Sequence, residues 1–228
     1  MDLAERYRSV QERISKAATN SGRTTDSINL IVVTKNHPAQ MVIDLAALGQ
    51  LEFGENRDQE ASQKAAEVAK VFPSAHWHFV GQLQTNKVKS VLRYAGTIHS
   101  IDRPSLVREL AKQLENQDAQ VDGFIELNLT SDENRGGVSE ANLKALTEEV
   151  LSVPRITLLG VMAVAGLGED PESEFEKARQ LSEVVSQLAP SATALSMGMS
   201  EDFEVAIAMG ATHIRVGSAI TGPREYSA

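Results

Sequence analysis

A chain of 228 residues with 42% hydrophobic side chains is long enough to bury a substantial core. No run of about 18 apolar residues could cross a bilayer, and the charged amphipathic start of the chain does not have the features of a signal peptide. The net charge of −9 without a basic run argues against nucleic-acid binding, and the lack of cysteine excludes disulfides, thiolate nucleophiles and cysteine-type zinc sites. We therefore expect a cytoplasmic protein that binds neither membranes nor nucleic acids.

Eight β-rich segments follow one another along the chain. Most of them are continuous apolar runs rather than alternations of apolar and polar residues, which is typical of parallel strands covered on both faces. The segments cover residues 28–35, 51–55, 76–81, 97–101, 123–130, 156–164, 194–199 and 213–218.

Helix-forming segments with recognisable ends separate the predicted strands. Pro38 opens the helix after the first strand, and Pro104 lies in the first turn of a later one. Asp170 precedes a long helical segment as its N-cap. Ser200 is expected as the N-cap of a shorter helix that ends at Gly210.

This alternation predicts an α/β protein with the fold of a single (β/α)8 TIM barrel and an extra N-terminal helix before the first strand. No Gly/Ser-rich linker interrupts it, so we expect one domain spanning residues 1–228. The alternative is an open, doubly wound sheet. The barrel is favoured because the strand count is right and no G-x-G-x-x-G motif follows the first strand.

The first predicted strand ends on a threonine and Lys35. In a barrel, this end of the strand lies on the face where barrel enzymes keep their active sites. A lysine that is partly desolvated there becomes a nucleophilic amine that can form a Schiff base. The alternative is that the strand simply ends and the lysine side chain extends to water.

A second feature of that face is a candidate phosphate site. Ser200 and the first N–H groups of the helix after it follow the seventh strand, and Gly217 and Ser218 follow the eighth. The loops after these two strands are the habitual phosphate site of TIM barrels, and glycine permits close backbone approach. Each residue alone is explained equally well by a helix cap or a turn. Together with Lys35 they predict a phosphorylated aldehyde that is bound covalently.

The histidines form one candidate metal pair. His76 and His78 share one face of a strand, and such an H-x-H pair can bind zinc or copper. Because no carboxylate or third histidine is evidently placed to complete the shell, we expect no metal site. His37, His99 and His213 are expected to be packed or hydrogen-bonded near strand ends.

Six segments of the chain resemble the pyridoxal phosphate homeostasis protein family, which are barrel relatives of the N-terminal domain of alanine racemase. They span nearly the whole predicted barrel, and the 28-residue block at the end is far more specific than a lone glycine motif. The segments are VVTKNHP (32–38), FGENRDQE (53–60), HWHFVGQLQTNK (76–87), IHSIDR (98–103), GVMAVAG (160–166) and residues 195–222.

The resemblance implies a bound cofactor, pyridoxal 5′-phosphate. Lys35 matches the family lysine that holds it covalently as an internal aldimine, and Asn56 matches an asparagine near it. Arg215 would face the pyridine nitrogen, as the corresponding arginine does in the racemase. The phosphate would be held by Ser200, Gly217 and Ser218.

The resemblance further implies a protein of intracellular pyridoxal phosphate (vitamin B6) homeostasis rather than a turnover enzyme. A guanidinium offers only donors, which disfavours protonation of the ring nitrogen and leaves a weaker electron sink. The chain also lacks the β-rich second domain that gives alanine racemase a catalytic tyrosine. We therefore expect a monomeric carrier or buffer with no catalytic residue, which passes the cofactor to apo-forms of enzymes that use it.

Two other functions remain open at this point. One is a Schiff-base-forming barrel enzyme with weak racemase-type or aldolase-type activity, acting through Lys35. The other is a regulatory protein that senses the cofactor and docks a partner through the 131–139 loop or the N-terminal helix.

Overall fold

The computed structural model describes residues 1–130, 135–166 and 168–222. The first four residues of the 131–139 loop that was expected as a docking surface, 131–134, lie outside these residues. The same holds for 223–228, so the prediction of one domain over 1–228 stays a prediction. Within the described ranges, no helix combines the length and apolar character needed to span a bilayer.

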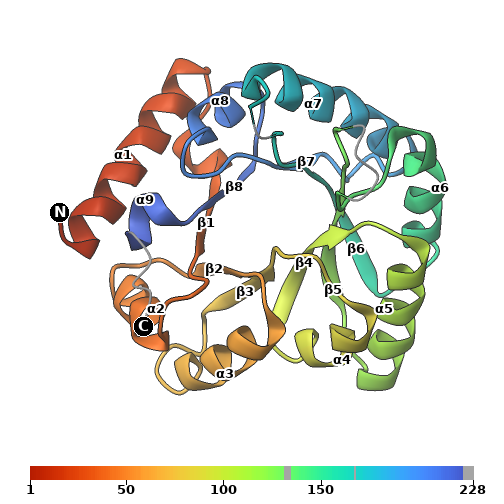
Figure 1. Cartoon of the computed structure of the whole chain (residues 1–228), viewed down its shortest axis with the longest axis horizontal. Coiled ribbons are helices and arrows are strands. Elements are labelled where there is room, and N and C mark those ends of the chain that lie inside the picture. Colours follow the sequence, from red (N-terminus) through yellow and green to blue (C-terminus); the bar gives the residue numbers. More distant parts are fainter. Residues whose placement is uncertain (131–134, 167, 223–228) are drawn as a thin grey trace.

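Eight parallel strands close into a barrel in chain order, with β8 paired to β1 (Figure 1). This confirms the predicted (β/α)8 barrel and excludes the open doubly wound sheet, which would have two edges. The strands are β1 (Asn29–Val33), β2 (Glu52–Glu55), β3 (His76–Phe79), β4 (Ala95–Ile101), β5 (Val121–Glu126), β6 (Ile156–Met162), β7 (Ala194–Ser196) and β8 (His213–Val216).

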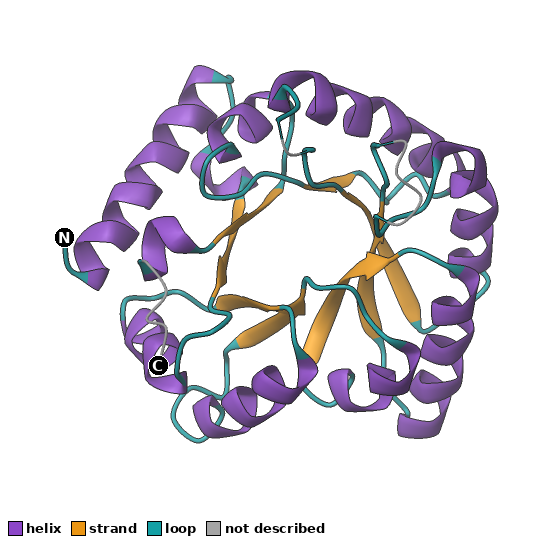
Figure 2. Ribbon diagram, viewed as in Figure 1, coloured by secondary structure: helices purple, strands orange, loops and turns teal. Residues whose placement is uncertain are grey.

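The helices form a ring around the barrel, as Figure 2 shows. Two short 3-10 helices, Thr25–Ser27 and Thr85–Lys87, lie in the connections. The α-helices are α1 (Leu3–Asn20), α2 (Ala39–Ala47), α3 (Asp58–Val68), α4 (Val88–Val91), α5 (Pro104–Gln117), α6 (Glu140–Leu151), α7 (Pro171–Leu188), α8 (Phe203–Ala208) and α9 (Ser218–Thr221).

Each predicted β segment overlaps one strand, although β4 and β5 begin two residues earlier than predicted, and most strands end earlier than predicted. The fifth was expected to reach residue 130, whereas β5 ends at Glu126. Leu127 and Leu129, beyond that end, are still buried. The apolar runs continue past the sheet because the loop residues also pack into the core, so hydrophobicity alone does not mark where the ladder stops.

Three of the predicted helix starts are confirmed and one is wrong. Pro38 precedes α2 as its N-cap residue, Pro104 is the first residue of α5, and the Asp170 side chain accepts a hydrogen bond from the backbone of α7. Ser200 is not an N-cap. Helix α8 begins only at Phe203, and the Ser200 hydroxyl instead accepts hydrogen bonds from the backbone after β8.

Helix α1 covers the seam where β8 meets β1, and so ties the last elements of the barrel to the first. Asp2 caps it in a capping box with Glu5. Arg6 Nε donates to the carbonyl of Ile220 in α9 at 2.7 Å, and Arg23 Nη1 donates to the carbonyl of Ala211 at 2.7 Å. The predicted N-terminal helix therefore holds α9 in place, and Ser218 is the first residue of α9.

Candidate functional site

Two cavities open at opposite ends of the barrel. The smaller, of about 470 Å³, lies at the N-terminal ends of the strands. The larger, of about 710 Å³, lies at their C-terminal ends. All six predicted site residues line the larger cavity, although they come from four different parts of the chain: Lys35, Asn56, Ser200, Arg215, Gly217 and Ser218.

Lys35 follows the end of β1 after one residue and is half-buried at the cavity wall. Its side chain makes no hydrogen bond or ion pair with any residue that the structure describes. The next residue, Asn36, has a φ of 63°, in the left-handed region that non-glycine residues rarely adopt. The turn that carries the lysine is therefore strained and must be held by its surroundings.

A buried ionic cluster lies directly beneath this turn. Lys64 Nζ from α3 donates to Glu55 Oε1 at 2.6 Å and to the carbonyl of Thr34 at 2.9 Å, while the Thr34 hydroxyl donates to the same Glu55 oxygen at 2.7 Å. The side chains of Lys64 and Glu55 are 3% and 0% exposed. Burial raises the pKa of Glu55, which the Lys64 ammonium opposes. This cluster fixes the residue immediately before Lys35.

The residue after Lys35 is held by the same cluster. Glu60 Oε1 accepts hydrogen bonds from Asn36 N at 2.7 Å and from Lys64 Nζ at 2.9 Å. Both sides of the lysine turn are thus anchored on α3. Sequence reasoning missed this cluster because Glu55 and Lys64 lie on a strand and a helix whose relative position only the fold defines.

Asn56 lies against the loop after β3, where a glycine is required. A Cβ atom on Gly81 would come within 2.8 Å of Asn56 Cα, which is closer than real contacts allow. Gly81 therefore lets the backbone of the F-G-E-N segment approach the H-F-V-G segment. This contact brings Asn56 to the cavity wall.

Arg215 extends from β8 into the interior and is 5% exposed. Its guanidinium donates from Nη1 to the Ser196 hydroxyl at 2.6 Å and from Nη2 to the carbonyl of Ala163 at 3.0 Å. Burial lowers its pKa to about 10, so it keeps its positive charge at neutral pH. An arginine has five N–H donors, and further donors remain for the cavity that the side chain lines.

Ser200 and the start of α9 form a convergence of hydrogen-bond donors. Gly217 N and Ala219 N donate to the Ser200 hydroxyl oxygen at 3.2 and 3.3 Å, and that hydroxyl keeps its own proton to donate. A Cβ atom on Gly217 would lie 3.4 Å from the carbonyl oxygen of Val33, which is an ordinary contact, so space alone does not require a glycine here. The hydroxyl proton of Ser200 and the N–H of Ser218, the first residue of α9, are left to donate to an anion.

Glu126, at the end of β5, is a candidate residue that sequence reasoning missed. Its Oε2 atom is buried and has no hydrogen-bond partner among the described residues. Burial and the neighbouring Asp102 raise its pKa to about 7, against the opposing charges of Arg215 and Arg135. A carboxyl group with this pKa exchanges protons near neutral pH. Nothing in the sequence singled it out, because it was predicted to lie inside the fifth strand, 123–130, and only the structure ends β5 at Glu126.

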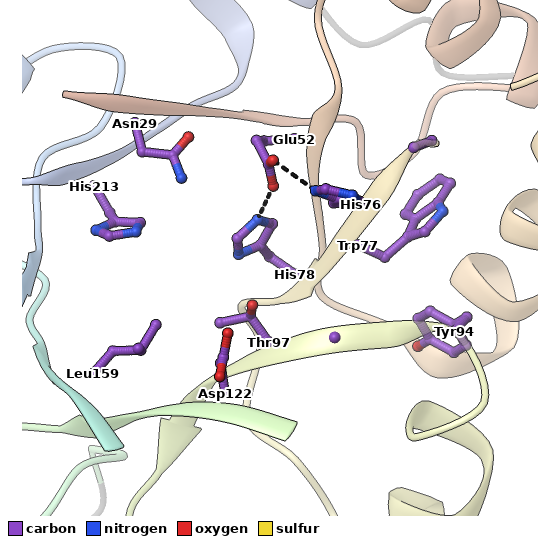
Figure 3. A pocket seen from close by; sticks show the side chains of 12 residues that line it. Asn29, Glu52, His76, Trp77, His78, Tyr94, Thr97, Asp122, Leu159 and His213 are labelled. Atoms are coloured by element: carbon purple, nitrogen blue, oxygen red, sulfur yellow. Dashed lines mark hydrogen bonds and ion pairs between the residues drawn. The ribbon is translucent and has the colours of Figure 1, made fainter. Parts of the chain in front are cut away.

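The histidine pair lies at the opposite mouth, in the smaller cavity (Figure 3). Glu52 accepts from His76 Nδ1 at 2.8 Å and from His78 Nε2 at 2.7 Å, so the expectation that no carboxylate accompanies the pair is wrong. His99 lies in the middle of β4 and not near a strand end. Among the residues described, no group of three or more histidine, aspartate or glutamate side chains is arranged to hold a metal ion.

The sequence of the chain is similar to those of known proteins over nearly its whole length. The family described as "Alanine racemase, N-terminal domain" matches residues 7–225. The pyridoxal phosphate homeostasis protein of Aquifex aeolicus is 38% identical over 230 residues, covering 99% of this chain and 100% of the relative. That of Escherichia coli is 35% identical, covering 99% of this chain and 98% of the relative.

Solved structures agree in fold. The structure of PipY of Synechococcus elongatus with PLP bound is 33% identical with a TM-score of 0.85, covering 97% of this chain and 100% of that one. Alanine racemase from Corynebacterium glutamicum is 14% identical with a TM-score of 0.70, covering 92% of this chain and 59% of that one, and shares the fold.

The raised pKa of Glu126 predicts a specific pH dependence of stability. The folded protein retains a proton up to about pH 7 that the unfolded chain, with an ordinary pKa of 4.5, has already released. The stability that this carboxyl contributes is therefore complete at low pH and is lost as the pH rises through 7. We expect Glu126→Gln to raise the free energy of unfolding by about 2 to 3 kcal/mol more at pH 8 than at pH 5.

Unfolding by denaturant at the two pH values measures this difference. Glu12→Gln, on the exposed side of α1, is the matched control and should show no such change. An equal effect of Glu126→Gln at both pH values would show that Glu126 is already ionised in the folded protein at pH 5.

Proposed function

Because the chain belongs to the alanine racemase N-terminal domain family and, within it, to the pyridoxal phosphate homeostasis proteins, we propose that it binds pyridoxal 5′-phosphate at the C-terminal mouth of the barrel. We further propose that it carries or buffers the cofactor and does not turn over a substrate. The observation that supports this most is that one cavity holds an amine with no partner among the described residues, a set of hydrogen-bond donors suited to an anion, and a buried cation. These correspond to the aldehyde, the phosphate and the ring nitrogen of the cofactor.

The residues present fit the cofactor group by group. Lys35 supplies the amine that condenses with the aldehyde carbon and releases water, which forms the covalent link. The Ser200 hydroxyl, oriented by the N–H of Gly217, and the N–H of Ser218 would supply neutral donors to the phosphate oxygens, and Gly217 lines the same wall of the cavity. Arg215 directs N–H groups at an acceptor nitrogen, and Asn56 borders the ring. When bound, the cofactor would supply an aldehyde for amines and an electron-withdrawing ring.

The carrier role follows from what surrounds the ring position. Arg215 remains charged at neutral pH and can only donate, so a ring nitrogen that faces it stays an unprotonated acceptor. Racemisation also needs a positioned acid or base on each face of the reacting carbon. The described lining of the cavity includes no tyrosine.

The assembly and the partners are part of the same proposal. All six site residues come from one barrel, so the site is complete without a second copy and we propose a monomer. The acceptors of the released cofactor would be apo-forms of pyridoxal phosphate enzymes, in the cytoplasm.

A Schiff-base enzyme with weak activity is the second candidate, and Glu126 favours it because a carboxyl with a pKa of about 7 near Arg215 is suited to proton transfer.

The covalent link is tested by reduction. We expect the protein loaded with pyridoxal phosphate to be yellow, and borohydride to fix one pyridoxyl group on the peptide that contains Lys35. Lys35→Ala should abolish both, whereas Lys87→Ala, which removes a half-exposed lysine outside the cavity, should abolish neither. Mass spectrometry of the digested protein locates the label, and a label on any other lysine would contradict the assignment.

The phosphate site is tested by comparing two vitamers. Pyridoxal lacks the phosphate, so it should bind much more weakly than pyridoxal phosphate. Ser200→Ala removes one of several donors and should weaken the binding of the phosphorylated form by about 1 to 3 kcal/mol, with little change for pyridoxal. Absorbance titrations give both affinities, and equal losses for the two vitamers would place the phosphate elsewhere.

The carrier role is tested by looking for turnover. Incubation with single L-amino acids should give no racemase, transaminase or decarboxylase activity above that of free pyridoxal phosphate, because the described lining of the cavity includes no tyrosine to act as the second acid or base. The loaded protein should nevertheless pass its cofactor to an added apo-enzyme, measured as recovered activity of that enzyme. Sustained turnover that disappears in Lys35→Ala would establish the enzyme instead.

A further inference from the structure

A continuous chain of hydrogen bonds runs through the inside of the barrel. It starts at Arg215 Nη1, which donates to the Ser196 hydroxyl at 2.6 Å. The hydroxyl lies 2.8 Å from His99 Nδ1, and His99 Nε2 lies 3.0 Å from His78 Nδ1. His78 Nε2 then lies 2.7 Å from Glu52 Oε2. The chain thus joins one cavity of the barrel to the other.

The direction of this chain follows from its two ends. A guanidinium can only donate and an ionised carboxylate can only accept. Hydrogen bonding to His78 and His76 keeps the pKa of Glu52 low despite its partial burial, so this carboxylate is ionised at neutral pH. His78 therefore carries a proton on Nε2, and the Arg215 end of the chain decides what its Nδ1 does. There the Ser196 oxygen accepts from Arg215, so the Ser196 hydroxyl proton is donated to His99 Nδ1. His99 then carries its own proton on Nε2 and donates it to His78 Nδ1.

The opposite direction would leave a buried group without a partner. If His99 carried its proton on Nδ1, the Ser196 oxygen would accept from both His99 and Arg215. Its own proton would then need another acceptor, and the described surroundings of Ser196, which is fully buried, provide none. An unsatisfied buried hydroxyl costs free energy. Burial also holds the pKa of His99 well below its usual value, so its ring is neutral and has one donor and one acceptor.

The far end of the chain is accessible to solvent. The side chain of Glu52 is 26% exposed in the smaller cavity, and that of His78 is 5% exposed. Figure 3 shows the rings of His76 and His78 on two sides of Glu52, each joined to it by a dashed line. His76 bonds the second carboxylate oxygen and takes no part in the chain, and its side chain is 67% exposed.

We propose that Ser196, His99 and His78 are positioning residues that hold Arg215 against the ring of the cofactor, with the order of their protons set by Glu52 at the opposite mouth. The inference rests on the proposed binding of pyridoxal phosphate. The described acceptors of the Arg215 side chain are the Ser196 hydroxyl and one main-chain carbonyl. The chain of hydrogen bonds therefore supplies one of the two. The orientation of the guanidinium at one end of the barrel thereby depends on a carboxylate at the other.

The order of the protons is measured first, on the protein without cofactor. We expect the nitrogen NMR shifts of the imidazole rings to show both His78 and His99 as neutral rings with the proton on Nε2. A proton on Nδ1 of His99 would overturn the proposal. This result does not depend on whether the protein binds pyridoxal phosphate.

The effect on the cofactor is measured next, by absorbance titration. Ser196→Ala should weaken the binding of pyridoxal phosphate roughly tenfold, because Arg215 loses an acceptor to which a charged group donates. The pH at which the visible band of the bound cofactor changes should also shift, which a general loosening of the fold would not cause. His99→Gln is the second variant, and His76→Gln is the matched control that should leave both values unchanged.

The outcomes separate the two proposals. If the wild-type protein carries no label on Lys35, the proposed function is overturned. The NMR shifts still decide the proton order, because they are measured without the cofactor. If the wild-type protein is labelled and Ser196→Ala and His99→Gln both bind with wild-type affinity and an unchanged pH profile, the positioning role is overturned. Unfolding curves of each variant identify a loss caused by misfolding, in which case the remaining variant and the NMR shifts decide.

Discussion

A positive charge inside the barrel is the constraint on which the rest of this site depends. Arg215 is almost fully buried, remains charged at neutral pH, and donates its described hydrogen bonds to two uncharged oxygens. A buried charge is costly unless polar groups replace the water that it loses. The barrel must therefore supply acceptors around Arg215, and a ligand with acceptor atoms in the larger cavity would complete that environment.

The interior of the barrel differs accordingly from the usual layers of branched aliphatic side chains. His78, His99 and Ser196 occupy its middle, and the ring of Phe124 stacks on His99 with centroids 4.5 Å apart. The apolar packing that holds the fold lies instead largely between the barrel and its ring of helices, which includes many of the largest fully buried side chains, such as Phe175 and Phe203. The inside of the barrel thus holds polar side chains that hydrogen-bond to one another.

The sequence predicted the parts of this structure that are local. Apolar runs located all eight strands, and the end of the first one predicted that Lys35 lies at the C-terminal mouth of the barrel, where the structure has it. Ser200 lies at the predicted mouth, but its hydroxyl bonds the backbone after β8 and does not cap a helix. The chain from Arg215 to Glu52 was not predictable, because its members are far apart in sequence and meet only through the register of strands around a closed barrel.

Lys35 and Arg215 are supported by separate networks, and under the proposed function this bears on how the cofactor would be released. The lysine turn rests on the cluster of Lys64, Glu55 and Glu60, whereas Arg215 rests on the interior chain. Among the described residues, the two networks share no hydrogen bond. If the cofactor is held as proposed, hydrolysis of its bond to Lys35 would therefore leave the phosphate donors and the guanidinium in place. The cavity opens to solvent at the same mouth, so such a stepwise release would not require the barrel to rearrange.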